Sequence, residues 1–476
     1  MSELSVGLVW KFAEKSSAQI ISFAVSIILA RLLLPEQYGL IAIVNVFIII
    51  ADVFLSAGFS NALVQKKNSD EVDFSTVLIL NTLISFVIYV LLFLLAPYIA
   101  LFYNNEELTM VLRVLGVKLI FAAYGGIQQA YISRYMLFKR TAIATIIASS
   151  FSGMIGIATA LLDCGVWALV AQQLSQTLIQ IALLQLVIKW KPKLIFSRSR
   201  AGGMLSYGLL FLVSNLLDTL STQIRGLLIG KMYSSSELAY YNRGDSYPQV
   251  LLNSINNTMH VVLFATYSQR QDNICVVKKL ARKSVKMSTF IVFPMMTGLA
   301  VVAKPLVLIL LTDKWLSCVP FLQVACVTYA TWIIQIVNQE AITALGKANN
   351  YFTITIIRSL FSLMVLVFSA QFGVVYIAIS AAIANVFSVV LVMYYSNKVF
   401  GYNIRELLYD IFPTISKCFI MAVVVYVLNY FIYSNMTLLI LQILVGVVTY
   451  LGLSYYRRDQ ELTILIAKYR QKKGGS

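Results

Sequence analysis

The chain has 476 residues, of which 59% are hydrophobic and only 12% are charged. A soluble protein of this size carries about a quarter charged residues, and it could not bury such an apolar excess. The composition and the mean hydropathy of +0.82 therefore exclude a soluble globular protein, a disordered chain, a collagen-like repeat and a disulfide scaffold. They predict an all-α polytopic membrane protein.

Apolar segments of roughly 20 residues, enough to cross the hydrocarbon core, recur along the whole chain. The fourteen expected spans are 9–34, 38–64, 74–102, 108–132, 141–163, 165–188, 204–230, 237–263, 287–311, 317–345, 351–370, 372–397, 411–433 and 435–456. The first apolar run continues to Leu34, which is too long for a signal-peptide core, so we expect an uncleaved first span. No break is long enough for a soluble domain.

A weak internal repeat predicts two halves. Leu34–Gly39 leads from the first span to the second, and Ser236–Tyr241 leads from the seventh to the eighth, about 200 residues later. We therefore expect an N-terminal six-helix lobe at 1–197, a C-terminal six-helix lobe at 198–400, and a trailing helix pair with a basic cytoplasmic tail at 401–476. The basic stretches 189–203 and 457–473 are expected to lie on the membrane surface.

The net charge of +17 follows from 37 basic and 20 acidic residues. If the N-terminus is cytoplasmic, 28 of the 37 cations fall in cytoplasmic segments, as the positive-inside rule requires. Three cations, Lys231, Lys304 and Lys314, fall outside. Both termini are therefore expected in the cytoplasm, and the charge predicts no nucleic-acid partner.

Metal and disulfide chemistry have little support in the sequence. The five cysteines are widely spread without a CxxC pair, and the single histidine is His260. We expect no metal site and no cofactor.

Charges inside a span cost roughly 2.5–3.5 kcal/mol each on insertion scales, so they usually face a cavity or a partner. Six cations fall in this class: Arg31, Arg113, Lys118, Arg225, Arg243 and Arg358. Helical spacing gathers polar residues into one stripe on each of the first, second, seventh and eighth spans. These stripes include Lys11, Lys15, Gln19, Asn45, Asp52, Asp218, Arg225, Gln249, Asn253 and Asn256.

Two interpretations of these stripes are open. A single serine or asparagine usually bonds to a neighbouring helix, whereas four matching stripes favour a shared hydrated cavity. The predicted cavity cations are Lys11, Lys15, Arg113, Arg225 and Arg243, although Arg243 lies near a helix end and could extend into the interface instead. The predicted polar lining is Gln19, Asn45, Asp52, Asp218, Gln249, Asn253, Asn256 and Glu340.

Several segments resemble one family. Arg31–Gly39 (RLLLPEQYG), Asp52–Gly58 and Asn61–Lys67 are similar to the opening of Wzx-type polysaccharide flippases, in the multidrug/oligosaccharidyl-lipid/polysaccharide exporter superfamily. Further matches are Leu263–Arg270, Trp315–Leu322 and Ala344–Lys347. The resemblance covers roughly residues 1–455, and its motifs are mostly structural.

The resemblance implies a MATE-like fold with two six-helix lobes around a central cavity, in the bacterial inner membrane. It implies that the cargo is an undecaprenyl-diphosphate-linked oligosaccharide for capsule, exopolysaccharide or O-antigen, moved to the outer leaflet by alternating access. The cavity cations would then meet the diphosphate, and Gln, Asn and Ser would replace sugar hydration. Membrane lipids, a polymerase and a chain-length regulator of the same pathway are the further partners that it implies.

Two other functions were weighed. A cation-coupled multidrug antiporter would need an acidic, aromatic pocket, but the first span carries lysines. A membrane enzyme such as a polysaccharide polymerase would need a catalytic grouping or a large outer loop, and neither is present. Coupling to protons or sodium ions would use Asp52, Asp218 or Glu340.

Overall fold

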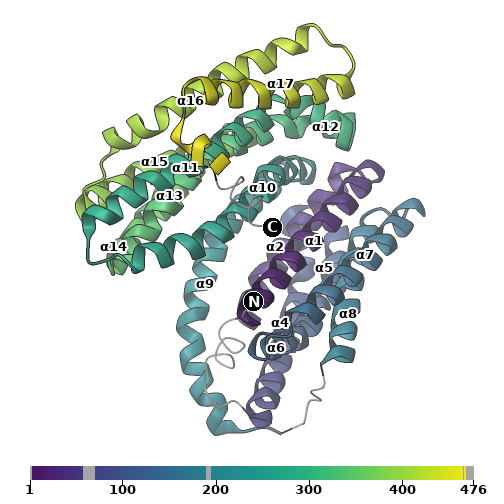
Figure 1. Ribbon diagram of the computed structural model, residues 1–476. Helices are drawn as coiled ribbons and strands as arrows, with labels where there is room; N and C mark the ends of the chain where they lie inside the picture. Colours follow the sequence, from purple (N-terminus) through teal and green to yellow (C-terminus); the bar gives the residue numbers. More distant parts are fainter. Residues whose placement is uncertain (1–2, 57–69, 189–194, 465, 468–476) are drawn as a thin grey trace. The chain divides into compact units, whose positions relative to one another are not determined.

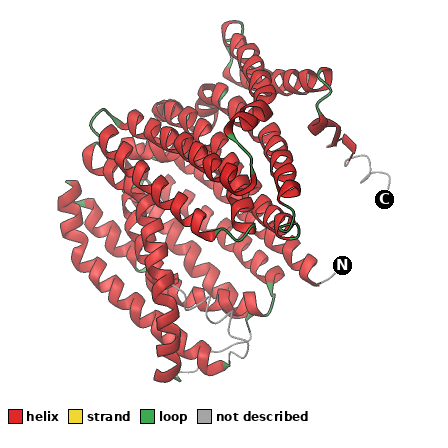
Figure 2. Cartoon of the chain, turned by 90° about the vertical axis from the view of Figure 1, so that its left-hand side faces the viewer, coloured by secondary structure: helices red, strands yellow, loops and turns green. Residues whose placement is uncertain are grey.

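The computed structural model describes residues 3–56, 70–188, 195–464 and 466–467. Within these ranges all regular structure is helical, and no strand occurs (Figure 2), which confirms the expected all-α class. Twelve helical segments of the described residues are long and apolar enough to cross a membrane, and α5 and α6 together form one of them. The expected number of fourteen is not confirmed, because α9 and α10 are long helices that fall outside these twelve.

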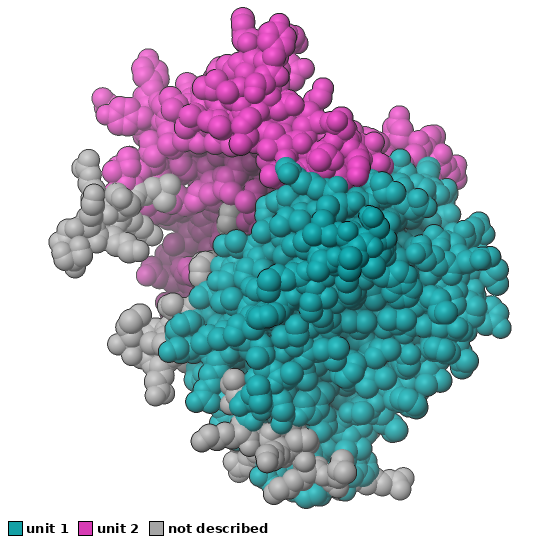
Figure 3. All heavy atoms as spheres, turned by 90° about the vertical axis from the view of Figure 1, so that its right-hand side faces the viewer, with its two compact units in different colours: residues 1–239 teal, residues 240–476 magenta. Residues whose placement is uncertain are grey.

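The chain divides into two compact units, residues 1–239 and 240–476 (Figure 3). The helices of the first unit (Figure 1) are α1 (Glu3–Leu32), α2 (Pro35–Ser56), α4 (Glu71–Tyr103), α5 (Glu107–Gly116), α6 (Lys118–Arg134), α7 (Phe138–Leu161), α8 (Val166–Val187) and α9 (Arg198–Met232). α9 packs on α2 and α4 and so belongs with the first unit. The lobe boundaries expected from the sequence stay predictions.

α10 (Ser235–Ser268) begins in the first unit and continues into the second. The second unit contains α11 (Ile274–Val301), α12 (Ala303–Leu311), η1 (Asp313–Cys318), α13 (Val319–Ala344), α14 (Ala348–Ser369), α15 (Val374–Phe400), α16 (Ile404–Val427), η2 (Leu428–Tyr430) and α17 (Asn435–Tyr456). α13 packs between α11 and α15, and α16 packs on both α11 and α17. α11 begins well before the expected span at 287–311, so the basic residues between 278 and 286 are helical.

The internal repeat is visible at the breaks between helices. Two residues separate α1 from α2, and two residues separate α9 from α10, with α2 and α10 starting at Pro35 and Ser235. Gly39 is required at this place, because a Cβ there would lie 1.7 Å from the carbonyl oxygen of Ser235. The resembling stretch Arg31–Gly39 therefore has a structural reason for its final glycine.

Small residues let α1 and α7 approach each other in the first unit. A Cβ on Gly153 of α7 would lie 2.4 Å from a methyl group of Val25 on α1. α7 also packs closely on α8, where a Cβ on Gly156 would lie 2.8 Å from the Cβ of Gln172. These contacts hold the polar residues of α1, α7 and α8 within reach of one another.

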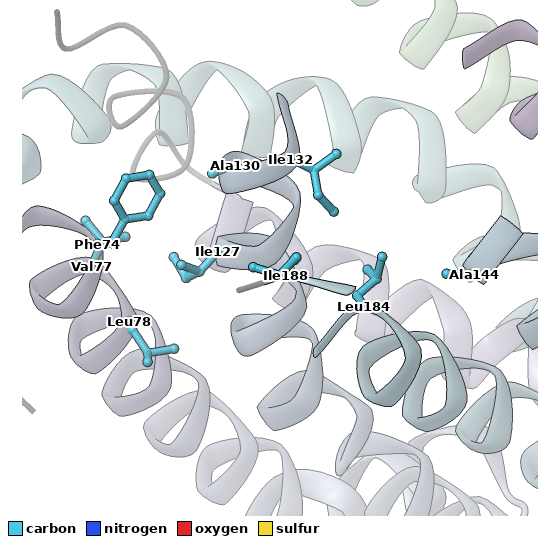
Figure 4. Close-up of a cluster of buried hydrophobic side chains, with 9 residues drawn as sticks. All are labelled: Phe74, Val77, Leu78, Ile127, Ala130, Ile132, Ala144, Leu184 and Ile188. Carbon is cyan, nitrogen blue, oxygen red and sulfur yellow. The ribbon is translucent and has the colours of Figure 1, made fainter. Parts of the chain in front are cut away.

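The apolar core of the first unit lies between α4, α6, α7 and α8. Figure 4 shows the buried side chains of this cluster: Phe74, Val77, Leu78, Ile127, Ala130, Ile132, Ala144, Leu184 and Ile188. Helix ends are fixed locally. Asp70 and Asp73 form a capping box at the start of α4, and Asn403 and Glu406 form one at the start of α16.

Candidate functional site

The polar stripe of α1 contains a buried carboxylate. Glu14 is only 8% exposed, and its Oε2 accepts a hydrogen bond from Lys11 Nζ at 3.0 Å. Lys15, on the next position, is exposed, and Gln19 is half-buried. The two predicted cations of α1 therefore differ, because Lys11 is engaged by a carboxylate of its own helix while Lys15 points out of the helix packing.

α7 and α8 complete the surroundings of Glu14. Thr145 Oγ1 donates to Glu14 Oε1 at 3.4 Å, and Gln180 Nε2 donates to Thr145 Oγ1 at 3.4 Å. The Lys11 ammonium also lies 5.9 Å from the Phe138 ring centroid, at the start of α7. We call Lys11, Glu14, Thr145 and Gln180 the Glu14 network. It joins three helices of the first unit and places one anion beside one cation.

A second polar group joins α6 to α8. Buried Gln128 donates to Gln185 Oε1 at 3.1 Å and to the carbonyl of Ile181 at 3.3 Å, and the Tyr124 hydroxyl donates to the same Gln185 oxygen. Amide and hydroxyl groups of this kind either fix helix packing or replace the hydration of a sugar. Tyr124 and Gln128 are four residues apart and so share one helix face, whereas no spacing in the sequence links them to Gln185.

Asp52 of α2 has an electrostatic partner in the first unit. The coulombic partner of its carboxylate is Lys118, at the start of α6. Asp52 is half-buried, as is Asn45 on the same helix. Lys118 was one of the six cations inside the spans, and the structure brings it to an acid of the polar stripe.

Arg113 precedes a turn within the span expected at 108–132, and its side chain contacts α4. The sequence treats 108–132 as one helix, on which Arg113 aligns with Tyr124 and Gln128. In the structure α5 ends at Gly116 and a turn at Val117, with bonds between residues three apart, precedes α6. The Arg113 guanidinium instead lies 4.1 Å from the Phe93 ring centroid, and its Nε donates to the Phe93 carbonyl at 3.3 Å. Arg113 is therefore engaged with α4.

The predicted residues of the second unit are more dispersed. The Arg243 guanidinium lies 5.1 Å from the ring centroid of buried Trp315, which accounts for the resembling segment that begins at that tryptophan. Glu340, half-buried on α13, lies near enough to buried Tyr267 for an electrostatic interaction. Gln249 is exposed.

For the remaining predicted residues the structure gives the helix on which each lies and, for one of them, the burial of the side chain. Arg225 is half-buried on α9. Asp218 on α9, and Asn253 and Asn256 on α10, are helical, but their side chains lie outside the described part of the structure. Whether these four residues face one cavity stays a prediction.

The densest group of charges joins α11 to α16 in the second unit. Arg282 makes two hydrogen bonds to Asp410, at 2.7 and 2.8 Å, and Lys286 lies 3.2 Å from the same carboxylate. Lys278 pairs with Glu406 at 2.9 Å. The Tyr402 hydroxyl donates to Asp410 at 3.0 Å. Burial and the Asp410 charge raise the pKa of Tyr402, which keeps this donor protonated. We call these residues the α11–α16 cluster.

A buried lysine joins α16 to the residues after α17. Lys417 is 2% exposed and pairs with Asp459, while its ammonium lies 3.4 Å from Ser454 Oγ. The rings of Phe290 and Tyr450 lie 5.1 and 5.5 Å from the same ammonium. The Lys417 side chain is thus enclosed by residues of α11, of α17 and of the turn after α17.

An apolar groove of about 510 Å³ lies within the second unit. Residues of α11 and α12 form one wall, with Pro294 and Gly298 among them, and residues of α16 and α17 form the other. Tyr450 donates to the Phe290 carbonyl at 2.8 Å and Gln442 Nε2 donates to the Val425 carbonyl at 3.3 Å, whereas the buried Gln442 Oε1 accepts no hydrogen bond from the described residues. Because the side chains that line it are mostly apolar, the groove suits an apolar occupant. Among the described residues no group of His, Cys, Asp and Glu could hold a metal ion.

Comparisons with known proteins agree on one family. The family described as "Polysaccharide biosynthesis protein" matches residues 28–320. The teichuronic acid biosynthesis protein TuaB of Bacillus subtilis is 27% identical over 307 residues, 63% of each chain. The succinoglycan biosynthesis transport protein ExoT of Rhizobium meliloti is 24% identical, over 66% of this chain and 63% of its own. The chain thus matches less than two thirds of the length of either relative.

A solved structure shares the fold. The lipid II flippase MurJ, in an inward closed conformation, superposes with a TM-score of 0.77 at 18% sequence identity, over 95% of this chain and 99% of that one. At this identity the similarity concerns the fold, which agrees with the exporter fold that the sequence resemblance implied.

Proposed function

The chain belongs to the polysaccharide biosynthesis protein family, and from that premise we propose that this multi-pass membrane protein is a flippase. Its cargo is a polyprenyl-diphosphate-linked oligosaccharide, which it moves from the inner to the outer leaflet of the bacterial inner membrane by alternating access. The observation that carries the proposal is the conjunction of this family with a MurJ-like fold, since the names of the relatives describe polysaccharide biosynthesis and transport, and MurJ is named a lipid II flippase.

The charge and hydration of the cargo explain why a lysine on α1 is important for transport. A diphosphate and a hydrated sugar cannot cross hydrocarbon unaided, because desolvating fixed charge costs many kcal/mol. A lysine near the start of a membrane-spanning segment can meet the phosphate with a charge-assisted bond, and Lys15 lies near the start of the apolar segment Ala13–Leu32. Lys15 is exposed on α1, next to the Glu14 network, so it is the cation that we assign to the first contact with the diphosphate.

The apolar part of the cargo needs a different surface. The groove between α11, α12, α16 and α17 has the volume of a ligand site, and the side chains that line it are mostly apolar. We assign part of the polyprenyl chain to this groove. The sugar, the diphosphate and the chain would then be held by different kinds of side chain.

The experiment is a flipping assay on the purified full chain in liposomes. The probe is a fluorescent undecaprenyl-diphosphate disaccharide, quenched by dithionite only in the outer leaflet. Lys15→Gln should slow flipping roughly tenfold, the factor for one lost charge-assisted bond, without changing the amount of protein in the liposomes. Lys279→Gln is the matched control, because Lys279 is also an exposed helical lysine but lies on α11.

Wild-type protein that leaves the probe unflipped, while it confers resistance to cationic drugs in cells, would point to an antiporter instead. Flipping that is equally fast in both lysine variants would remove Lys15 from the site. Dependence of the rate on a proton or sodium gradient tests ion coupling, for which Asp52, Asp218 and Glu340 remain the proposed acids.

The sidedness of the chain is part of the proposal. We propose that both termini are cytoplasmic, in keeping with the distribution of cations. Cys164, between α7 and α8, and Cys275, at the start of α11, are both exposed and would lie on opposite sides, whereas Cys318, Cys326 and Cys418 are buried.

A membrane-impermeant maleimide added to intact cells should therefore label the wild-type chain and the Cys275→Ser variant. It should not label Cys164→Ser until the membrane is permeabilised. Labelling of Cys164→Ser in intact cells would reverse the orientation. A polymerase and a chain-length regulator of the same pathway are the protein partners that this function calls for.

A further inference from the structure

Glu14 has the environment of a held anion rather than that of a surface carboxylate. Each of its oxygens has a donor, Lys11 for Oε2 and Thr145 for Oε1, and the side chain is 8% exposed. Thr145 is itself bonded by Gln180. The carboxylate therefore keeps a defined place between α1, α7 and α8, in contact with one of the two lysines expected to meet the cargo.

The contacts of the Glu14 carboxylate are asymmetric. The lysine contact is short, at 3.0 Å, and charge-assisted, while the threonine contact is long, at 3.4 Å. The Lys11 side chain is 33% exposed, so its ammonium can still be reached by another anion. A carboxylate and a phosphate oxygen accept the same kind of bond from an ammonium group, and a diphosphate carries the larger charge.

We propose that Glu14 is an intramolecular competitor of the cargo diphosphate for Lys11. Between transport cycles the carboxylate holds the ammonium, and the diphosphate displaces it when the cargo binds. The exchange deepens the proposed function and rests on it. Lys11 has an anionic partner in both states, so the protein avoids the cost of an unpaired, partly buried cation.

The competition sets the affinity. A site with two unengaged lysines would hold the diphosphate more tightly than a transporter can use, since the cargo must leave on the far side. Displacing Glu14 consumes part of the binding free energy, and the returning carboxylate assists release. Thr145 and Gln180 keep Glu14 close while it is displaced, so that it can return to the same ammonium.

The test measures binding of undecaprenyl diphosphate to the purified full chain in nanodiscs, with undecaprenol as the uncharged control. Glu14→Gln should bind the diphosphate about tenfold more tightly, which corresponds to about 1.4 kcal/mol, and should flip the fluorescent probe more slowly. Lys11→Gln should bind more weakly, because the remaining carboxylate repels the ligand. The double variant, neutral at both positions like the wild-type pair, should bind near the wild-type affinity.

A merely structural ion pair gives a different pattern. Glu14→Gln would then lower the melting temperature and bind the diphosphate no more tightly than wild type, and that result would overturn the proposal. Glu14→Asp provides a second route if the amide variant does not fold. It keeps the charge but withdraws the carboxylate from Lys11 by one methylene, so it should tighten binding by a smaller factor, and unchanged or weaker binding counts against competition.

The outcomes separate the two proposals. If wild-type protein binds undecaprenyl diphosphate no better than undecaprenol, the flippase function itself fails. If wild type prefers the diphosphate and neither Glu14 variant tightens binding, the function stands and the competition does not.

Discussion

Buried carboxylates have different numbers of partners in the two units. In the Glu14 network one carboxylate meets one lysine, and its other contact is a neutral hydroxyl at 3.4 Å. In the α11–α16 cluster Asp410 is fully buried and accepts from Arg282, Lys286 and Tyr402, with contacts from 2.7 to 3.2 Å. The first group has spare capacity for another ligand, and the second is saturated.

The Glu14 network can therefore exchange one partner for another, whereas the α11–α16 cluster holds two helices together. A bidentate arginine–carboxylate pair with a further lysine and a tyrosine fixes the position of α16 on α11. A carboxylate with one lysine partner and one long, neutral contact has fewer bonds to break when its partner is exchanged. Single substitutions in the two units test this comparison, and they follow from the largest expected effect to the smallest.

The largest effect is expected for Asp410→Asn. The substitution leaves Lys286 without its carboxylate and Arg282 with the longer, 3.6 Å contact to Glu406, and breaking a buried pair on one side costs roughly 3–5 kcal/mol. Part of this is lost to solvent screening, because the Arg282 side chain is 31% exposed. The melting temperature of the purified protein and its abundance in the membrane measure the effect. Glu406→Gln, at a 28% exposed partner of the same cluster, should cost clearly less; equal melting temperatures would contradict the saturated arrangement.

A smaller loss is expected for Asp459→Asn. It leaves the ammonium of Lys417, which is 2% exposed, without its carboxylate, at a cost of about 2 kcal/mol. The double variant Lys417→Met/Asp459→Asn removes the stranded charge and should recover most of the melting temperature. A double variant as unstable as the single one would mean that the pair is not what stabilises the end of α17.

The smallest effect is expected for Thr145→Val. This nearly isosteric change removes two long hydrogen bonds, the one from Thr145 to Glu14 and the one from Gln180 to Thr145, each at 3.4 Å, so the free energy of unfolding should fall by about 1 kcal/mol. The thermal unfolding of Thr145→Val is compared with that of Gln128→Leu. Gln128 is fully buried and makes two hydrogen bonds, so its replacement should cost more. A loss for Thr145→Val as large as that for Gln128→Leu would make the Glu14 network as structural as its neighbours.

The sequence predicted the helical class, most of the spans and the polar stripe of α1, because apolar length and helical period are local properties. It also located the repeat at the two-residue breaks before Pro35 and Ser235. Glu14 is the sequence neighbour of Lys15, which belongs to that stripe. Its partners Thr145 and Gln180 lie more than a hundred residues away, so no helical period predicts these contacts.

Two kinds of feature escaped prediction. The turn at Val117 was not expected, and the contact of Arg113 with Phe93 joins α5 to α4, which no helical period links. The cations between 278 and 286 looked like loop charges, because their carboxylate partners belong to α16, 128 residues later. Such pairs exist only once tertiary packing has brought two amphipathic helix ends together.

The α11–α16 cluster also has a consequence for the groove. α11 contributes to one wall and α16 to the other, and the cluster fastens these two helices at one end. The two walls are therefore held together at that end, and any widening of the groove for a hydrocarbon chain is expected to be larger away from the cluster.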